Sequence, residues 1–231
     1  MTRRVLAILA SLTALLIAPA ASFASAREPI AEAPTIQYGA VEAGGGQIGC
    51  EYWRLATYVG DQVTFRWQDI EGEYGPNVNL YSPATEDATI RSATPVASHA
   101  TQGGANLLEF TAPFTGLAVL QVMANTSCFD IDRIATYTFT ATVTHAVSLA
   151  IAAPVLARPH SLVTISATIH SVAGTPEGAC LIQDTEAVLT DGRCSRRIRL
   201  GRAGRQTVRV SFVPSGGWQE ASGSRHIRLA R

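Results

Sequence analysis

The chain has 231 residues, no lysine, and a formal net charge of zero that conceals two oppositely charged halves. Residues from Arg27 to His145 include five arginines and thirteen acidic residues, a formal charge of −8. Residues from Ala146 to Arg231 include eleven arginines and five acidic residues, a formal charge of +6. This shift argues against one large sandwich and favours two domains of about 100 residues. Such halves either dock on each other or face partners of opposite charge, although genomic base composition would also explain the all-arginine usage.

Residues 1–26 have the composition of a secretion signal. Arg3 and Arg4 precede an apolar run from Val5 to Ala18, and Ala24-Ser25-Ala26 forms a small-residue cleavage site. The run is shorter than the roughly 20 residues of a membrane span, which leaves an uncleaved anchor as the alternative. We predict a secreted protein, extracellular or associated with the cell envelope, with no transmembrane segment after cleavage.

All four cysteines follow the predicted cleavage site: Cys50, Cys128, Cys180 and Cys194. An even number in an exported chain indicates disulfides, for which three connectivities are possible. Proximity in sequence favours Cys50–Cys128 and Cys180–Cys194, one bridge in each half. A metal site is the alternative, but the chain has no Cys-x-x-Cys pair and no histidine at ligand spacing from these cysteines. We therefore predict two disulfides and no metal.

Residues 27–48 contain two prolines and three consecutive glycines, which predict a flexible lead-in with one short strand near Ile36–Tyr38. Gly44, Gly46 and Gly49 match the spacing of a dinucleotide-binding loop. That function needs a strand before the glycines and a helix after them, whereas a strand-like segment follows here. We interpret the match as accidental.

From Cys50 to His145 the sequence predicts strands throughout. Val63, Phe65 and Trp67 alternate with polar residues, which gives one buried and one solvated face. Trp67 is therefore predicted to be buried. Further strands are predicted at residues 78–80, 108–110, 117–123 and 137–143.

Four segments, VGDQVTF, NVNLYSP, LEFTAPFTGLAVLQVMA and YTFTATV, follow in order the pattern of bacterial pre-peptidase C-terminal-type domains. Residues 49–145 therefore resemble that family, although Ala118 stands where the family usually has an aromatic residue. The resemblance implies a β-sandwich module of the kind appended to secreted proteases and other exported proteins.

The stretch from Gly174 to Pro214 has the clearest strand periodicity in the chain. Ile198 and Leu200 alternate with Arg197 and Arg199, and the apolar residues from Val208 to Phe212 alternate with Arg209 and Ser211. Further strands are predicted at residues 163–169 and 226–229. Turns are predicted at Thr175-Pro176, Asp191-Gly192 and Ala203-Gly204.

This order of strands and turns resembles a bacterial Ig-like repeat over residues 146–231. Such repeats occur in surface and adhesion proteins and as appendages of exported enzymes, so the resemblance implies a second β-sandwich. The predicted fold class is therefore all-β, with two β-sandwich domains in tandem after a signal peptide.

Catalytic motifs are absent from the sequence, which has no GxSxG elbow, no HExxH and no P-loop. The five histidines are scattered, and His170 falls on the polar face of its predicted strand. We predict no enzymatic activity, no catalytic residue and no cofactor.

Calcium is an alternative at two acidic segments. The oxygen-bearing residues are Asp69, Glu71, Glu73 and Asn77 in one segment, and Asp130 and Asp132 in the other. Neither has a complete ligand spacing, which favours solvated side chains. Trp218, which follows two glycines, either forms an exposed platform for sugar or plugs the end of a sandwich.

The candidate site for an anionic ligand comprises Arg197, Arg199 and Arg209, which are predicted to share one outward sheet face. Such a face would attract an acidic wall polymer, a lipid head group or nucleic acid, and export argues against nucleic acid. The alternative is a solvated face that prevents edge pairing. Further arginines lie nearby in sequence at Arg196, Arg202 and Arg205.

These features favour an exported, non-enzymatic binding or adhesion module at the bacterial cell envelope. The expected partner is a cell-wall or extracellular polymer or another envelope protein. One alternative is an accessory domain pair of an exported peptidase or glycan-degrading system. The other is a purely structural envelope protein.

Overall fold

The computed structural model describes residues 30–47, 50–71, 77–86, 89–90, 92–100, 107–123, 134–202 and 204–230. Apart from one short 3-10 helix, η1 (Ile30–Glu32), its elements are β-strands, as the sequence predicts. The N-terminal half contains β1 (Val41–Gln47), β2 (Cys50–Thr57), β3 (Gln62–Glu71), β4 (Asn77–Tyr81), β5 (Ala97–Ala100), β6 (Leu107–Thr111), β7 (Gly116–Met123) and β8 (Ile134–Thr144). The C-terminal half contains β9 (Ser148–Ala152), β10 (Leu156–Ala157), β11 (Leu162–His170), β12 (Gly178–Ile182), β13 (Thr185–Ala187), β14 (Arg193–Arg199), β15 (Gly204–Pro214) and β16 (Ala221–Leu229).

Two four-stranded sheets build the N-terminal half, in the orders β1-β8-β3-β6 and β2-β7-β4-β5. Both sheets contribute to one apolar cluster that includes Trp53, Phe65, Trp67 and Phe139, all at most 2% exposed. Trp67 is buried as predicted, because it alternates in phase with Val63 and Phe65. The strands predicted between residues 50 and 145 all occur. The short strand predicted near Ile36–Tyr38 does not occur, and beside it only Thr35 forms an isolated β-bridge, with Arg54.

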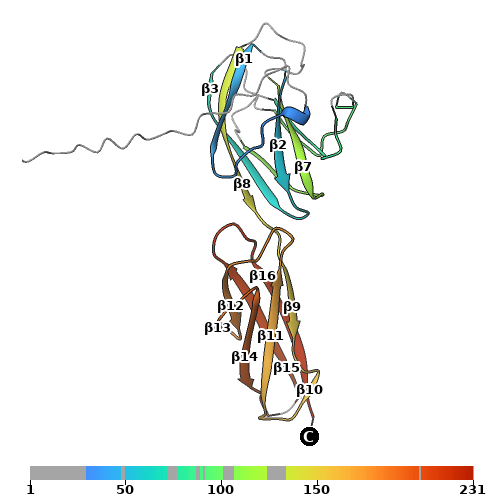
Figure 1. Ribbon diagram of the computed structural model, residues 1–231. Coiled ribbons are helices and arrows are strands. Elements are labelled where there is room, and N and C mark those ends of the chain that lie inside the picture. The colour runs from blue at the N-terminus through green and yellow to red at the C-terminus, as the bar shows by residue number, and fades with distance from the viewer. Residues whose placement is uncertain are drawn as a thin grey trace, which may run out of the picture.

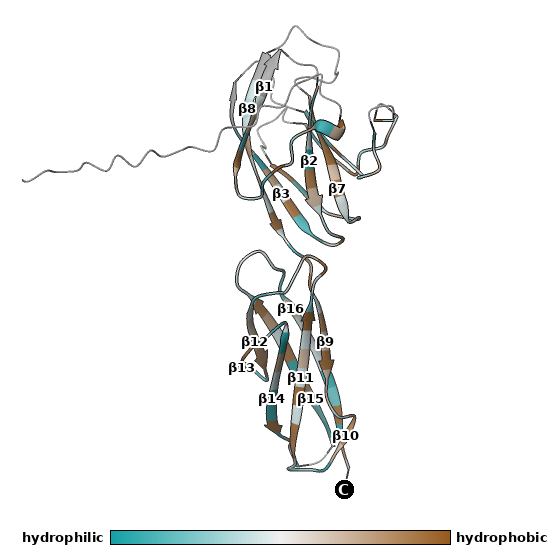
Figure 2. Ribbon diagram, in the orientation of Figure 1, coloured by the Kyte–Doolittle hydropathy of each residue, from teal (hydrophilic) through white to brown (hydrophobic). Residues whose placement is uncertain are grey.

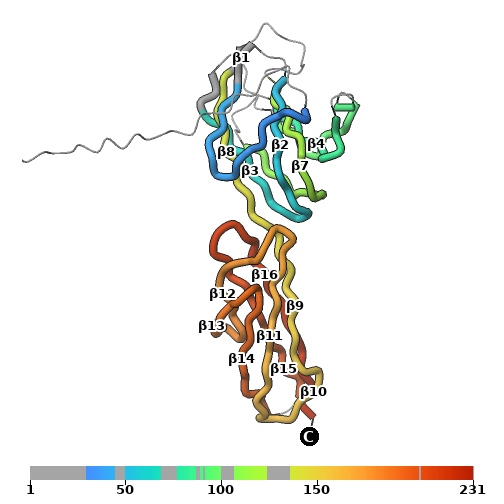
Figure 3. Tube along the Cα trace, in the orientation of Figure 1, coloured from blue at the N-terminus to red at the C-terminus, as the bar shows by residue number. Residues whose placement is uncertain are grey.

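A five-stranded sheet, β10-β16-β15-β12-β13, and a three-stranded sheet, β14-β11-β9, build the C-terminal half. They enclose a second apolar cluster that includes Ile165, Val208, Phe212 and Ile227. The alternating hydrophobic and hydrophilic positions along these strands are visible in Figure 2. Figures 1 and 3 show the halves end to end, with the chain passing between them from β8 into β9.

The segment predicted as a flexible lead-in belongs largely to the first sandwich. Val41–Gln47 pairs with β8 in antiparallel register, and Ile36 is buried in the core. Gly44 lies opposite Tyr137, and a Cβ at Gly44 would collide with the Tyr137 hydroxyl and the Glu51 carboxylate. Gly44 therefore permits close passage of β1 over buried polar groups.

Those polar groups form a buried cluster in the first half. The Tyr137 hydroxyl donates to Glu51 Oε2 and accepts a hydrogen bond from Trp53 Nε1 at 3.4 Å. Burial, followed by the neighbouring Glu51 carboxylate, raises the pKa of Tyr137 well above its usual value. The neutral phenol therefore serves as a hydrogen-bond donor to a buried acid.

The two halves meet around Asp61, whose side chain is fully buried. Its carboxylate accepts hydrogen bonds from the backbone N–H of Tyr58 at 3.0 Å and of Ala146 at 3.1 Å. His145 Nδ1 lies 3.0 Å from the same carboxylate. Asp61 thereby ties the turn between β2 and β3 to the segment that enters β9.

Gln219 of the C-terminal half makes a second contact across the junction. Its side-chain amide donates to the backbone oxygens of Gly60, at 2.9 Å, and Thr144, at 3.4 Å. Trp218 packs on the C-terminal core, with its ring centroid 5.3 Å from that of His145. Trp218 therefore plugs the end of the C-terminal sandwich, which is the second of the two alternatives predicted for it from the sequence.

Candidate functional site

The outward side of β14 carries a row of arginines. Along this strand Cys194 is buried, whereas Arg193, Ser195, Arg197 and Arg199 are exposed. Alternate side chains of a strand point the same way, so these four lie on the outer face of the three-stranded sheet. Arg197 and Arg199 therefore share a face, as predicted, and Arg193 extends it.

The neighbouring strand β11 adds hydroxyl groups beside the arginines. Thr164 pairs with Arg197, Ser166 with Ser195, and Thr168 with Arg193. Directly paired residues in an antiparallel sheet point to the same side. We define the arginine face as Arg193, Ser195, Arg197 and Arg199 of β14 with Thr164, Ser166 and Thr168 of β11.

A hollow of about 650 Å³ lies at the end of the arginine face that contains Arg193. Its polar lining comes from Ser166, Thr168, Thr190, Arg193 and Ser195, and the exposed Val188 adds an apolar wall. One cationic group among several hydroxyls is suited to an acidic ligand that also offers hydroxyl groups.

The three-stranded sheet under this face has no Asp or Glu in its strands β9, β11 and β14, and the nearest acidic residue in sequence is Asp191 in the turn before β14. Within the described residues, the guanidinium groups of Arg193, Arg197 and Arg199 make neither a hydrogen bond nor an ion pair. Arg196 points the other way, and its Nη1 donates to the backbone oxygen of Glu186 at 3.5 Å. The arginine face thus has three cations available to a ligand.

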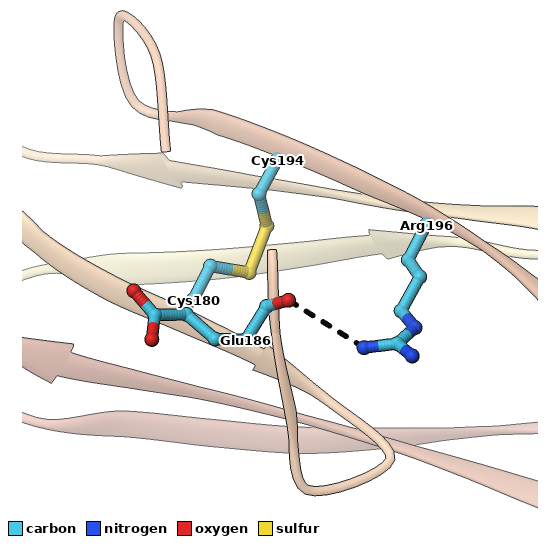
Figure 4. Close-up of a disulfide and its surroundings, with 4 residues drawn as sticks. All are labelled: Cys180, Glu186, Cys194 and Arg196. Carbon is cyan, nitrogen blue, oxygen red and sulfur yellow. Dashed lines mark hydrogen bonds between the residues drawn. A yellow bond between two sulfur atoms is a disulfide. The ribbon is translucent and has the colours of Figure 1, made fainter. Parts of the chain in front are cut away.

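The Cys180–Cys194 disulfide holds this edge strand in place (Figure 4). It confirms the predicted pairing, but it joins β12 of one sheet to β14 of the other instead of bridging adjacent strands. Both cysteines are buried, and their Cα atoms are 6.4 Å apart. Cys50 is also disulfide-bonded, and Cys128, its predicted partner, lies outside the described residues.

The prediction that Arg209 shares the face of Arg197 and Arg199 is wrong. Arg209 is exposed on β15, which belongs to the five-stranded sheet on the other side of the core. Sequence alternation establishes that all three residues point outward, but it carries no information on which sheet a strand joins. The chain between β14 and β15 crosses from one sheet to the other.

The other sequence candidates supply little chemistry. In the described part of the chain, no three His, Cys, Asp or Glu side chains are grouped to hold a metal ion. For the calcium alternative, Glu73, Asp130 and Asp132 lie outside the described residues, as do the side chains of Asp69 and Glu71. Asn77 Oδ1 is buried and has no hydrogen-bond partner among the described residues. Calcium binding stays an untested alternative.

Comparison with known proteins assigns no family, since no protein-family model and no curated protein matches the sequence. The structure is similar to PliG from Aeromonas hydrophila, a periplasmic lysozyme inhibitor of g-type lysozyme. That match has a TM-score of 0.38 and 14% identity, and covers 48% of this chain and 96% of that one.

Two further solved structures are similar over more of this chain. A DUF4785 family protein from Legionella pneumophila has a TM-score of 0.27 and 7% identity over 82% of this chain and 61% of its own. A putative beta-galactosidase from Bacteroides fragilis has a TM-score of 0.24 and 10% identity over 82% and 34%. Similarities at this level assign no function.

One feature of the described structure agrees with export. A buried disulfide is typical of proteins that fold in an oxidising compartment. No helix within the described residues has the length and hydropathy needed to cross a membrane. The disulfide is compatible with the export predicted from residues 1–26, which lie outside the described residues.

Proposed function

We propose that this protein is an exported, non-enzymatic binding module that holds a linear acidic polysaccharide of the cell envelope along its arginine face. The observation that carries the proposal is the row of Arg193, Arg197 and Arg199 on a sheet without acidic residues. The sequence resemblances to β-sandwich modules of exported and surface proteins agree with this role.

The spacing of the row favours an extended ligand. Outward side chains two positions apart on a strand are separated by roughly 6.6 Å, so Arg193 and Arg199 lie about 20 Å apart along β14. A single small anion could not reach from Arg193 to Arg199. A chain with repeated carboxylates can engage several, and each contact releases bound counterions.

The hydroxyl row favours a saccharide over a simple polyanion. Thr164, Ser166 and Thr168 present donors and acceptors beside the arginines, and sugar hydroxyls need both. The hollow next to Arg193 provides room for a sugar ring against Val188. Charge draws the polymer to the face, and the hydroxyl groups supply selectivity.

The test measures binding to polygalacturonate, a linear polymer of carboxylated sugars, as a function of salt concentration. The variant Arg193→Ser/Arg197→Ser should bind at least roughly tenfold more weakly and show a salt slope lower by about one to two. The matched control is Arg205→Ser/Arg209→Ser, which removes the same charge from the opposite sheet and should retain most of the affinity.

The neutral polymer dextran serves as the ligand control and should not bind. Equal losses in the two double variants would show that net charge alone attracts the polymer, and would overturn the arginine face as a site. Salt-independent binding, or none, would favour the structural envelope role. All four exchanged arginines are exposed, so their replacement should leave cooperative unfolding intact.

A further inference from the structure

Figure 1 shows the end of the C-terminal half that lies away from the junction with the N-terminal half. We call it the distal end and define it by Val155, Leu156, Arg158, Leu162, Arg199, Arg202, Arg205 and Arg228. No acidic residue occurs in segments 153–164, 197–209 or 226–230, from which it is built. The distal end therefore concentrates cationic groups and lacks local acidic partners.

Its arginines are adjacent to exposed leucines. On the five-stranded sheet, β10, β16 and β15 are neighbours, and their register places Leu156, Arg228 and Arg205 in one row across the outer face. On the three-stranded sheet, Leu162 pairs with Arg199. Each sheet therefore ends in a row that combines an aliphatic side chain with guanidinium groups.

Arg205 and Arg228 are direct cross-strand partners, and both are exposed. Like charges in this position destabilise a sheet. Within the described residues, the side chains of both arginines lack a hydrogen bond or ion pair, and the same holds for Arg158 and Arg202. An anionic surface would relieve the repulsion between Arg205 and Arg228.

The aliphatic side chains project into solvent to an extent that folding does not explain. Val155 is 81% exposed, Leu156 60% and Leu162 53%. An acidic polysaccharide offers little apolar area to three aliphatic side chains at once, whereas a lipid bilayer accepts aliphatic groups beneath a layer of head groups. Arginine is suited to the same boundary, because its stem packs on apolar groups while its charged head reaches phosphate.

Backbone hydrogen bonds hold the loops of the distal end together. His160 N donates to Gly201 O at 3.0 Å, and Leu200 N donates to Ser161 O at 3.0 Å. The Gln206 side chain accepts from Gly201 N at 2.8 Å. These bonds join the β10–β11 loop to the β14–β15 loop, so Arg158 and Arg202 start from fixed backbone positions and binding orders few residues.

We propose that the distal end docks on an anionic lipid bilayer, with its arginines at the phosphate groups and its exposed aliphatic side chains among the upper acyl segments. This attachment is peripheral and involves no membrane span. It goes beyond the proposed polymer binding and shares only Arg199 with the arginine face, which runs along the side of the sandwich. A bilayer at the distal end leaves Arg193 and Arg197 accessible.

The test is co-sedimentation of the oxidised protein with vesicles of equal parts phosphatidylglycerol and phosphatidylcholine, and with phosphatidylcholine vesicles. Binding should require the anionic lipid and weaken with salt. Arg205→Ser/Arg228→Ser should lower the affinity about thirtyfold, since each basic residue near an anionic surface contributes about a factor of five. Leu156→Ser/Leu162→Ser should lower it by about tenfold.

The control for the leucine variant is Val172→Ser/Val213→Ser, which alters exposed valines near the junction with the N-terminal half and should bind as wild type. Equal vesicle binding by wild type and the leucine variant would overturn docking into the bilayer, as would binding that ignores lipid charge. Vesicle binding lost in Arg193→Ser/Arg197→Ser but kept in Arg205→Ser/Arg228→Ser would also overturn it. Polygalacturonate binding, measured on the same variants, tests the proposed function separately, because neither leucine belongs to the arginine face.

Discussion

Asp61 of the N-terminal half and His145 of the connecting segment are 84 residues apart in sequence, and their side chains lie 3.0 Å from each other. The Asp61 carboxylate is fully buried and also accepts the backbone N–H of Ala146. Burying a carboxylate costs free energy unless hydrogen bonds satisfy it. The contact therefore favours the one arrangement of the connecting segment in which Asp61 is hydrogen-bonded. The junction is therefore a specific hydrogen-bonded contact between the two halves and more than a connecting segment.

Replacing Asp61 with alanine should destabilise the protein by about 2–4 kcal/mol. The change leaves the backbone N–H groups of Tyr58 and Ala146 without their acceptor, and each such loss costs about 1–3 kcal/mol when the group is buried. Urea unfolding measures the effect. Glu109→Ala, at an exposed position of β6, is the control and should stay within about 0.5 kcal/mol of wild type. An Asp61 variant as stable as this control would contradict the assignment.

The C-terminal half should fold without the N-terminal half. It has its own apolar cluster and its own disulfide, so a fragment from Ala146 to Arg231 should unfold cooperatively under oxidising conditions. Thermal unfolding followed by circular dichroism tests this. A fragment that stays unfolded until the N-terminal half is added would show that the junction is required for folding.

Gly44→Ala should destabilise the N-terminal half by about 1–3 kcal/mol or more. A methyl group at this position meets the Tyr137 hydroxyl and the Glu51 carboxylate, both held in a packed interior. The matched control is Gly201→Ala, where the nearest atom to a new Cβ is Gln206 Oε1 at 3.6 Å. The two melting temperatures should differ clearly. Equal melting temperatures of the two variants would mean that β1 moves away from Tyr137 and Glu51 at no cost in free energy.

Removing the disulfide with Cys180→Ser/Cys194→Ser should cost about 3 kcal/mol, as expected for a closed loop of this size. The variant should also bind polygalacturonate more weakly, because β14 is an edge strand and the disulfide joins it to the opposite sheet. Comparing affinities below the unfolding transition separates this effect from global unfolding. Unchanged affinity in the folded variant would show that pairing with β11 alone positions the arginines.

The positions of the strands and the side of each strand that is buried were predictable from the sequence, because both depend on the local alternation of apolar and polar residues. Residues 63–67 and 163–169 carry period-two patterns, and the structure forms β3 and β11 there with the expected side buried. Asp191 and Gly192 both adopt positive φ, which is the conformation that the Asp-Gly turn signal predicts. The Cys180–Cys194 pairing followed from proximity in the chain.

Contacts between distant segments had no local signal. The glycine run of β1 resembles a loop until Tyr137 and Glu51 are seen beneath Gly44. The strands β14 and β15 belong to different sheets, which separates Arg209 from Arg197. Within the five-stranded sheet, the pairing of β10, β16 and β15 brings Leu156, Arg228 and Arg205 into one row. The sequence by itself determined which residues face water, since that depends on alternation along each strand. Only the tertiary structure decided which of them lie side by side, because strand order arises from packing two sheets around a core.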